Sequence, residues 1–189
     1  IEGRAFQSCK KLTYIGIPES VVDIGNGLTF AACTSLQEFN VADGNPNYAS
    51  VNGVLFDKEK KNLIACPGGI SGSYIVPGNV TGIGGGAFNG CENLTDVTMP
   101  DGVTSIDREA FLGCSNLTRI VIPASVSSIG NSAFSGCSGL TEVYYGGTEA
   151  QWDAVSIVSI GNDALANAQI HYDSSGPASF TIDSITISD

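Results

Sequence analysis

Residues 106–129 read IDREAFLGCSNLTRIVIPASVSSI, and the segment before them, residues 83–106, reads IGGGAFNGCENLTDVTMPDGVTSI. Both fit the pattern I-G-x-x-A-F-x-x-C-x-x-L-T-x-V-x-I-P-x-x-V-x-x, which recurs every 23 residues. Further copies begin at Ile1 and Ile129, and a fifth copy, from Ile24, has one additional residue before its cysteine. A fixed period of this length indicates a repeat architecture, so the fold follows from what one copy can form.

The apolar positions within one copy predict a short β-strand. Leu117, Ile120 and Ile122 have a spacing whose last two members alternate, as in a strand with one buried face. Pro123 ends the run because it has no N–H to donate to a neighbouring strand. Each copy therefore contributes one strand, and the residues between the inward positions point outward.

Each copy also predicts a turn on the side opposite to the strand. Ala110, Phe111 and Cys114 have the spacing of a single helical turn. A coil this small cannot bury its own apolar side chains, so coils must stack roughly 4.8 Å apart with equivalent residues in contact. We therefore predict a repeat solenoid of about five to six coils, built from short parallel β-strands and short helical turns around ladders of Phe, Cys, Leu and Ile.

The pattern A-F-x-x-C-x-x-L-T-x-V-x-I-P closely resembles the BspA-type leucine-rich repeats, which are common on surface and secreted proteins of bacteria. The resemblance extends from residue 1 to about residue 172. It implies a curved, right-handed leucine-rich-repeat solenoid and usually a binding or adhesive role. It does not imply a reaction.

Two regions depart from the repeat within the expected solenoid at residues 1–172. Residues 45–67 have apolar runs on either side of a charged stretch, which predicts a β-hairpin with a polar tip. The period does not decide whether this hairpin projects or completes a coil. Residues 146–172 have the longest helical pattern and are expected to cap the stack. Residues 173–189 are expected to be a linker followed by the first strand of a further β domain, with a disordered tail as the alternative.

A glycine-rich stretch at residues 82–87, GIGGGA, matches the G-x-G-x-x-G/A fingerprint of dinucleotide-binding turns. The three glycines at 84–86 align with Asp107, Arg108 and Glu109 of the next copy. Because bulky charged residues fit at these positions, we expect a glycine-rich repeat turn and no nucleotide site.

The charge of the chain limits its partners. The 189 residues include 8 basic and 19 acidic ones, giving a net charge of −11, which repels phosphate backbones and anionic headgroups. We expect no nucleic-acid partner. No apolar run approaches the roughly 20 residues that cross a bilayer, so we expect no direct membrane insertion of this segment. The only histidine is His171, which limits acid–base and metal chemistry, and we predict no cofactor, no metal and no catalytic residue.

The cysteines are expected to form a ladder of buried thiols. Five of the six occupy one repeat position: Cys9, Cys33, Cys91, Cys114 and Cys137. No C-x-x-C pair occurs, so the spacing of a zinc site is absent. Stacked coils bring these cysteines close together, which leaves crosslinks as an alternative. Cys66 lies outside the ladder, and we expect it to be a buried free thiol.

Three further features have a structural interpretation that we prefer to the functional one. Of the sequons at Asn79, Asn93 and Asn116, two are the N-L-T step of the repeat, which argues against glycosylation. We expect His171 to lie at the surface or pack within the cap. Residues 43–47 supply oxygens that suit calcium, but they lack the downstream glutamate of an EF-hand, and turn chemistry explains them.

The outward side chains of the strands form the best candidate binding surface, because a stack of strands holds them at a fixed pitch. Nine residues are predicted to line it: Tyr14, Glu38, Asn40, Asp96, Thr98, Arg119, Val121, Glu142 and Tyr144. Gly16 and Ile75 belong to the same rows. This mixture suits a protein or a glycan, and a merely solvated sheet face is the alternative.

Two functions fit these observations. The first is a non-catalytic binding or adhesion module of a bacterial cell-surface or secreted protein, which recognises an extracellular protein or glycan through the sheet face. The second is a structural spacer that holds another domain of a larger surface protein away from the cell wall. Both place the chain outside the cell or at its surface.

Overall fold

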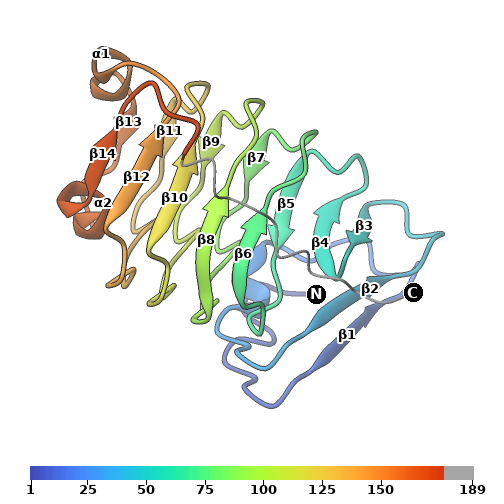
Figure 1. Ribbon diagram of the computed structural model, residues 1–189. Helices are drawn as coiled ribbons and strands as arrows, with labels where there is room; N and C mark the ends of the chain where they lie inside the picture. The colour runs from blue at the N-terminus through green and yellow to red at the C-terminus, as the bar shows by residue number, and fades with distance from the viewer. Residues whose placement is uncertain (177–189) are drawn as a thin grey trace.

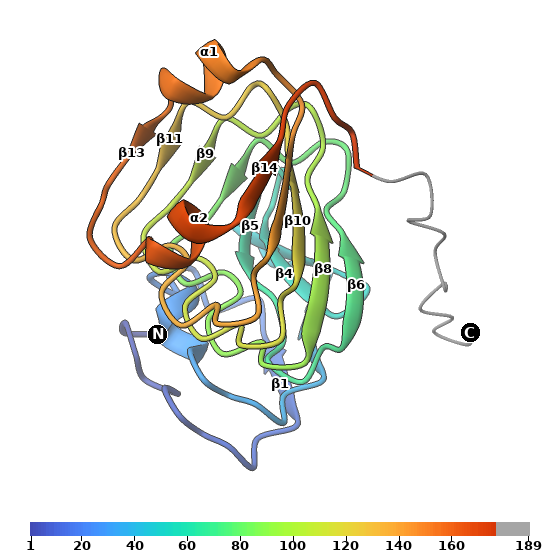
Figure 2. The ribbon, with the colours of Figure 1, turned by 60° about the vertical axis from the view of Figure 1, so that its left-hand side comes forward.

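The computed structural model describes residues 1–176, which form a solenoid of about seven coils (Figure 1). Each regular coil gives one strand to each of two sheets, and the two sheets form opposite sides of the stack (Figure 2). The predicted repeat solenoid is confirmed. The count of coils exceeds the prediction because residues 62–82 and 156–172 each complete a coil of their own.

The first sheet contains the strands that the repeat predicts. Its five strands pair in parallel in the order β14-β12-β10-β8-β6. They are β6 (Gly72–Ile75), β8 (Leu94–Thr98), β10 (Arg119–Ile122), β12 (Glu142–Tyr145) and β14 (Gln169–His171). Leu117, Ile120 and Ile122 are fully buried, as their alternation predicts.

The second sheet has seven strands in the order β13-β11-β9-β7-β5-β4-β3. They are β3 (Tyr48–Val51), β4 (Val54–Asp57), β5 (Asn62–Ala65), β7 (Gly82–Ile83), β9 (Ser105–Ile106), β11 (Ser128–Ile129) and β13 (Ser156–Ile157). A separate sheet pairs β1 (Tyr14–Ile17) with β2 (Glu38–Val41). The strand face expected to be continuous is therefore interrupted between β2 and β6.

The turns at residues 107–118 join β9 to β10, so they lie between the two sheets and not opposite to the five-stranded sheet as predicted. They also differ from the helical turn that the spacing predicts. The Leu112 N–H donates to the Glu109 carbonyl at 3.1 Å, and the Cys114 N–H donates to the Phe111 carbonyl at 3.2 Å. Glu109 and Gly113 have φ angles of 57° and 77°, in the left-handed region that a helix cannot include. The result is a series of tight turns in place of a helical turn.

Phenylalanine rings of successive turns stack on one another. The Phe88 and Phe111 ring centroids are 4.8 Å apart, and those of Phe111 and Phe134 are 5.2 Å apart, with nearly parallel planes in both pairs. These distances are close to the spacing of neighbouring strands. All three rings are fully buried. The predicted phenylalanine ladder is confirmed for these coils.

The cysteine ladder hydrogen-bonds each coil to the one before it. The Cys114 thiol donates to the Phe88 carbonyl at 3.1 Å, and the Cys137 thiol donates to the Phe111 carbonyl at 3.0 Å. Cys33 donates in the same way to the Phe6 carbonyl at 3.0 Å, whereas Cys91 donates to the Pro67 carbonyl at 3.7 Å. The hydrogen-bonded Cys137 thiol and burial raise the pKa of Cys114 well above its usual value. Cys9 is exposed, so the prediction of a buried thiol is wrong at this first position of the ladder. Cys66 is a buried free thiol, as expected.

The insert at residues 45–67 forms a wall inside the stack and does not project from it. Its strands β3, β4 and β5 run antiparallel, and β5 then pairs in parallel with β7. Val54 and Phe56 of β4 join the hydrophobic core of the later coils, whereas Leu55 joins that of the first two coils. Strand β4 is therefore buried on both faces, between two cores.

The glycines at residues 84–86 have a packing role that the repeat alignment does not predict. The 3₁₀ turn η1 (Gly27–Phe30) of the second coil lies directly against them. A Cβ at Gly86 would lie 2.8 Å from the Leu28 nitrogen, and a Cβ at Gly27 would lie 2.7 Å from the Gly86 carbonyl carbon. The expectation that bulky residues fit here is wrong for Gly84 and Gly86 of this coil, whose Cβ atoms would clash with the Leu63 carbonyl and Leu28, whereas Gly85 has room for a side chain.

The last coil contains two short helices, which lie at the end of the stack (Figure 1). Helix α1 (Glu149–Asp153) begins at Thr148, whose hydroxyl accepts from the Gln151 N–H, and α2 (Asp163–Asn167) buries Leu165. Strands β13 and β14 extend both sheets here. Within residues 1–176, no helix has the length and apolar character needed to span a bilayer. The expected β-strand at 180–188 lies outside the described residues.

A substitution at Gly113 tests whether the turn requires a left-handed backbone conformation at this position. Replacing it with alanine introduces no close contact, since the nearest atom to the new Cβ is 4.0 Å away. Gly113→Ala should therefore lower the free energy of unfolding by about 1–2 kcal/mol through left-handed strain alone. Gly78→Ala is the matched control, because its Cβ also meets open space and its φ is not positive. Chemical denaturation measures both, and equal effects would contradict the assignment.

The buried ladder also predicts how the thiols react. In the folded protein at pH 8, a disulfide reagent should modify Cys9 rapidly, because it is the exposed cysteine. The other cysteines should react only after unfolding in guanidinium. Thiol titration checks this, and Cys9→Ser should remove the rapid phase. Rapid reaction of the Cys9→Ser variant would show that the ladder is open to solvent.

Candidate functional site

Two rows of outward side chains cross the five-stranded sheet in register. The charged row is Ser73, Asp96, Arg119, Glu142 and Gln169. The aromatic row is Ile75, Thr98, Val121, Tyr144 and His171. Six of the nine predicted site residues thus share one face at strand spacing, because equivalent positions of parallel coils pair directly.

The other three predicted residues lie on the separate two-stranded sheet. Tyr14 pairs with Glu38, and Gly16 pairs with Asn40. The Asn40 side-chain amide donates to the Tyr14 hydroxyl at 3.2 Å, and the Tyr14 side chain is well exposed. No ladder connects β2 to β6 in the described part of the chain, so these residues do not continue the two rows.

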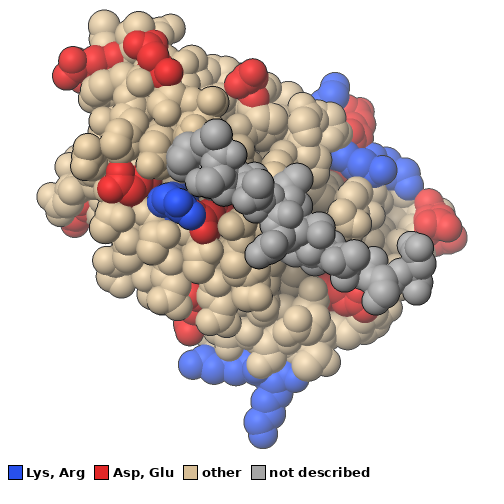
Figure 3. Space-filling model, viewed as in Figure 1, with Lys and Arg blue, Asp and Glu red and all other residues tan. Residues whose placement is uncertain are grey.

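In the charged row, the basic Arg119 lies between the acidic Asp96 and Glu142. Arg119 Nε donates to Asp96 Oδ1 at 2.5 Å, while the Thr95 and Ser73 hydroxyls donate to Asp96 Oδ2 at 2.6 and 3.3 Å. Burial alone would raise the pKa of Asp96, but the hydrogen bonds from Arg119, Thr95 and Ser73 and the positive charge of Arg119 outweigh it and lower that pKa. Figure 3 shows one basic side chain between acidic ones over this sheet. Arg119 is therefore held mainly by its own neighbours.

His171 belongs to this face, which the sequence prediction missed. Its Nε2 contacts Glu142 Oε2, and its ring stacks on Tyr144 with centroids 4.6 Å apart and planes 12° apart. Of the two expected positions, the surface one is correct, because β14 continues the sheet and the His171 side chain is 33% exposed. The alternation in Q-I-H-Y, with Ile170 opposite Val143, is the signal that indicates this outward position.

Val121 was predicted to face outward, but it is only 5% exposed. The chain returns past this edge after β14, since the Ser174 N–H donates to the Tyr145 carbonyl at 3.0 Å. A hollow of about 390 Å³ remains beside it, lined by Thr98, Met99, Asp101, Val121, Pro123, Gly146, Asp173, Ser174 and Ser175. The buried Thr98 hydroxyl has no hydrogen-bond partner among the described residues.

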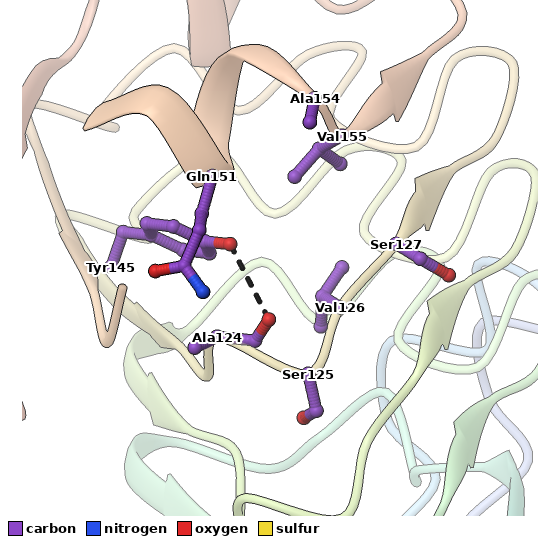
Figure 4. A pocket seen from close by; sticks show the side chains of 8 residues that line it. All are labelled: Ala124, Ser125, Val126, Ser127, Tyr145, Gln151, Ala154 and Val155. Carbon is purple, nitrogen blue, oxygen red and sulfur yellow. Dashed lines mark hydrogen bonds between the residues drawn. The ribbon is translucent and has the colours of Figure 1, made fainter. Parts of the chain in front are cut away.

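A second, smaller hollow lies beneath α1, with a volume of about 200 Å³ (Figure 4). The Tyr145 hydroxyl donates across it to the Ala124 carbonyl at 3.4 Å. Gln151 also lines it, but its side-chain oxygen accepts from the Thr148 N–H at 2.8 Å as part of the helix cap. No charged side chain lines this hollow. It is explained by the packing of α1 against the coil below.

The remaining sequence candidates have structural roles. The side-chain amides of Asn79 and Asn116 donate to backbone carbonyls of the preceding coil, each at 2.8 Å. Asn45 is fully buried, and its amide donates to the Pro18 and Val21 carbonyls of the first coil. These bonds connect coils, and in Asn79 and Asn116 they use the amide nitrogen to which a glycan would attach. Calcium would need oxygens, and Asn45 Oδ1 already accepts from the Asn47 and Tyr48 N–H groups at 3.0 and 2.9 Å.

The Asp96 contacts predict a pH-dependent contribution to stability. The pKa of Asp96 is lower in the folded state, so its stabilisation is present above the unfolded value of about 3.9 and is lost as the pH falls through the folded value. Asp96→Asn should lower the free energy of unfolding by about 1–3 kcal/mol at pH 7. This deficit should shrink between pH 5 and pH 2 in urea titrations. A deficit that is constant with pH would contradict the ion pair.

Comparison with known proteins places this architecture in a family. The family model of the BspA type leucine rich repeat region matches residues 1–71 and 71–184 with 6 copies. A leucine-rich repeat protein from Eubacterium ventriosum is 27% identical, with a TM-score of 0.72 over 85% of this chain and 42% of its own. The pneumococcal vaccine antigen PcpA is 25% identical, with a TM-score of 0.59 over 86% of this chain and 45% of its own.

This chain thus spans less than half the length of either solved protein. No curated protein matches it. The family model nevertheless covers nearly the whole chain, and the ladders of phenylalanine and cysteine follow its period. The chain therefore belongs to the BspA-type leucine-rich repeat family.

Proposed function

We propose that this chain is a non-catalytic binding module of a bacterial cell-surface or secreted protein. It recognises an extracellular protein or glycan through the outward face of the five-stranded sheet. The observation that carries the proposal is the stacked Tyr144–His171 pair beside Glu142 and the Thr98 hollow. Aromatic surface next to a few fixed polar groups is the usual composition of a recognition site.

Rigidity supports this proposal. Tyr144 and His171 lie on neighbouring strands that pair in register, and Glu142 is held by its contact with His171. Side chains that are already ordered lose little conformational freedom when a ligand binds. A ligand on this face therefore meets a surface that needs no rearrangement.

Other polar groups on this face contribute less than the aromatic pair. The Thr98 hydroxyl lacks a hydrogen-bond partner among the described residues, but its oxygen is buried, so a ligand would have to displace neighbouring side chains to bond to it. Arg119 is also less available, because Asp96 already binds its guanidinium.

The family and its members support the location. BspA-type repeats occur here in 6 copies, and one similar structure is a pneumococcal vaccine antigen. A leucine-rich-repeat solenoid is typically non-catalytic, which agrees with a binding role. We therefore place the protein outside the bacterial cell or at its surface.

The proposal can be tested by labelling this protein with a fluorophore and measuring its binding to arrays of immobilised oligosaccharides and purified extracellular proteins. For the array member that the wild-type protein binds, the double variant Tyr144→Ala/His171→Ala should have an affinity about tenfold or more weaker, with little change in melting temperature. Tyr14→Ala is the matched control, since it removes an exposed aromatic ring from the separate two-stranded sheet. It should leave binding within about twofold.

Two outcomes would overturn the proposal. Retention of full affinity by the double variant would show that the ligand binds elsewhere. Failure of the wild-type chain to bind any array member at micromolar concentrations would favour the alternative role, a spacer between other domains of a larger surface protein.

A further inference from the structure

The insert concentrates positive charge on an acidic molecule. Lys58, Lys60 and Lys61 are three of the 8 basic residues in a chain of net charge −11. All three belong to the connection between β4 and β5. Figure 3 shows basic side chains gathered at the edge of the molecule over β3 and β4, away from the five-stranded sheet.

The nearby carboxylates of Asp57 and Glu59 do not pair with the ammonium groups of Lys58 and Lys60. Asp57 accepts from the Lys61 and Asn62 N–H groups at 2.7 and 3.1 Å, and from the Asn62 amide at 2.6 Å. Glu59 pairs with Lys61 at 3.4 Å. Lys58 Nζ donates to a neutral acceptor, the Asp43 carbonyl, at 3.1 Å. Within residues 1–176, neither Lys58 nor Lys60 has a carboxylate oxygen within 4.0 Å.

Both lysines line a cavity of about 260 Å³ between the end of β2, β3 and the β4–β5 connection. Its lining is Val41, Ala42, Asp43, Tyr48, Ala49, Ser50, Lys58 and Lys60. The Ser50 hydroxyl oxygen accepts from the Val41 N–H at 3.1 Å, which leaves its O–H free to donate. Tyr48 is fixed, because its hydroxyl accepts from the Ile24 N–H at 2.9 Å. The cavity thus combines cationic donors with one fixed aromatic residue.

Asp43 decides what kind of anion suits this cavity. Asp43 lines the same cavity as the two lysines, so a phosphate or sulfate would be attracted by the lysines and repelled by Asp43. In a ligand that carries both a carboxylate and hydroxyl groups, a hydroxyl that donates to Asp43 offsets this repulsion. A sugar ring also offers C–H surface to Tyr48.

We propose that this cavity binds a hexuronic acid residue of an extracellular glycan. Lys58 and Lys60 bind the sugar carboxylate, Ser50 donates to it, and Asp43 accepts from a ring hydroxyl. The site lies on the insert and is independent of the binding role proposed for the five-stranded sheet. It gives the insert a function besides dividing the two cores.

Calorimetric titration of the whole chain with sodium glucuronate tests the proposal, with glucose and sodium acetate as reference ligands. Glucuronate should bind at least about tenfold more tightly than either, because only it has both kinds of group. Lys60→Gln should weaken glucuronate binding about tenfold. Lys61→Gln makes the same charge change at a lysine that pairs with Glu59 outside the lining, and it should change binding less than about twofold.

Asp43→Ala separates a sugar site from a simple anion site, because alanine removes the side-chain acceptor oxygens, whereas asparagine would keep one. For a hexuronic acid site, it should remove most of the preference for glucuronate over acetate. For a simple anion site, it should strengthen the binding of both ligands, because a repulsive charge is lost. That strengthening, equal losses in the two lysine variants, or equal affinity for acetate and glucuronate would each overturn the proposal. Tyr144→Ala/His171→Ala should leave glucuronate binding unchanged, which separates this site from the sheet face.

Discussion

Contact between equivalent positions of successive coils is the constraint on which the structure depends. No single coil can bury Phe111 or Cys114, yet both are fully buried because coils lie on either side of them. The Phe111 N–H donates forward to the Ala133 carbonyl at 2.8 Å, and the Phe111 carbonyl accepts from Cys137 of that next coil. Packing and hydrogen bonding therefore fix the same register, and each would be lost if the coils slipped.

This constraint explains why so much of the fold could be predicted. Where a residue packs against the equivalent residues of neighbouring coils, the repeat period of the sequence indicates its contacts. The phenylalanine and cysteine ladders and the inward positions of β10 therefore follow from spacing alone. The outward face of the five-stranded sheet follows less well, because alternation places Val121 and Asp96 outward although each is only 5% exposed. His171 was missed because the repeat pattern has faded by the last coil, where only the alternation of Q-I-H-Y remains.

Periodicity fails where a coil meets something other than its copy. The insert breaks the period, so no spacing indicates that β4 lies between two cores or that β2 and β6 belong to different sheets. The glycines at 84–86 are informative only with coordinates, because their neighbour is η1, more than fifty residues earlier. The lysine cavity likewise joins β2, β3 and the β4–β5 connection. Such contacts between unlike segments are the ones that a single sequence does not encode locally.

The thiol bonds of the ladder all point the same way, from each coil to the carbonyl of the coil before it. A coil added by tandem duplication in the regular part of the stack would bring its own donor and present a fresh acceptor to its successor. Such an insertion would leave the ladder of thiol bonds unbroken on both of its sides.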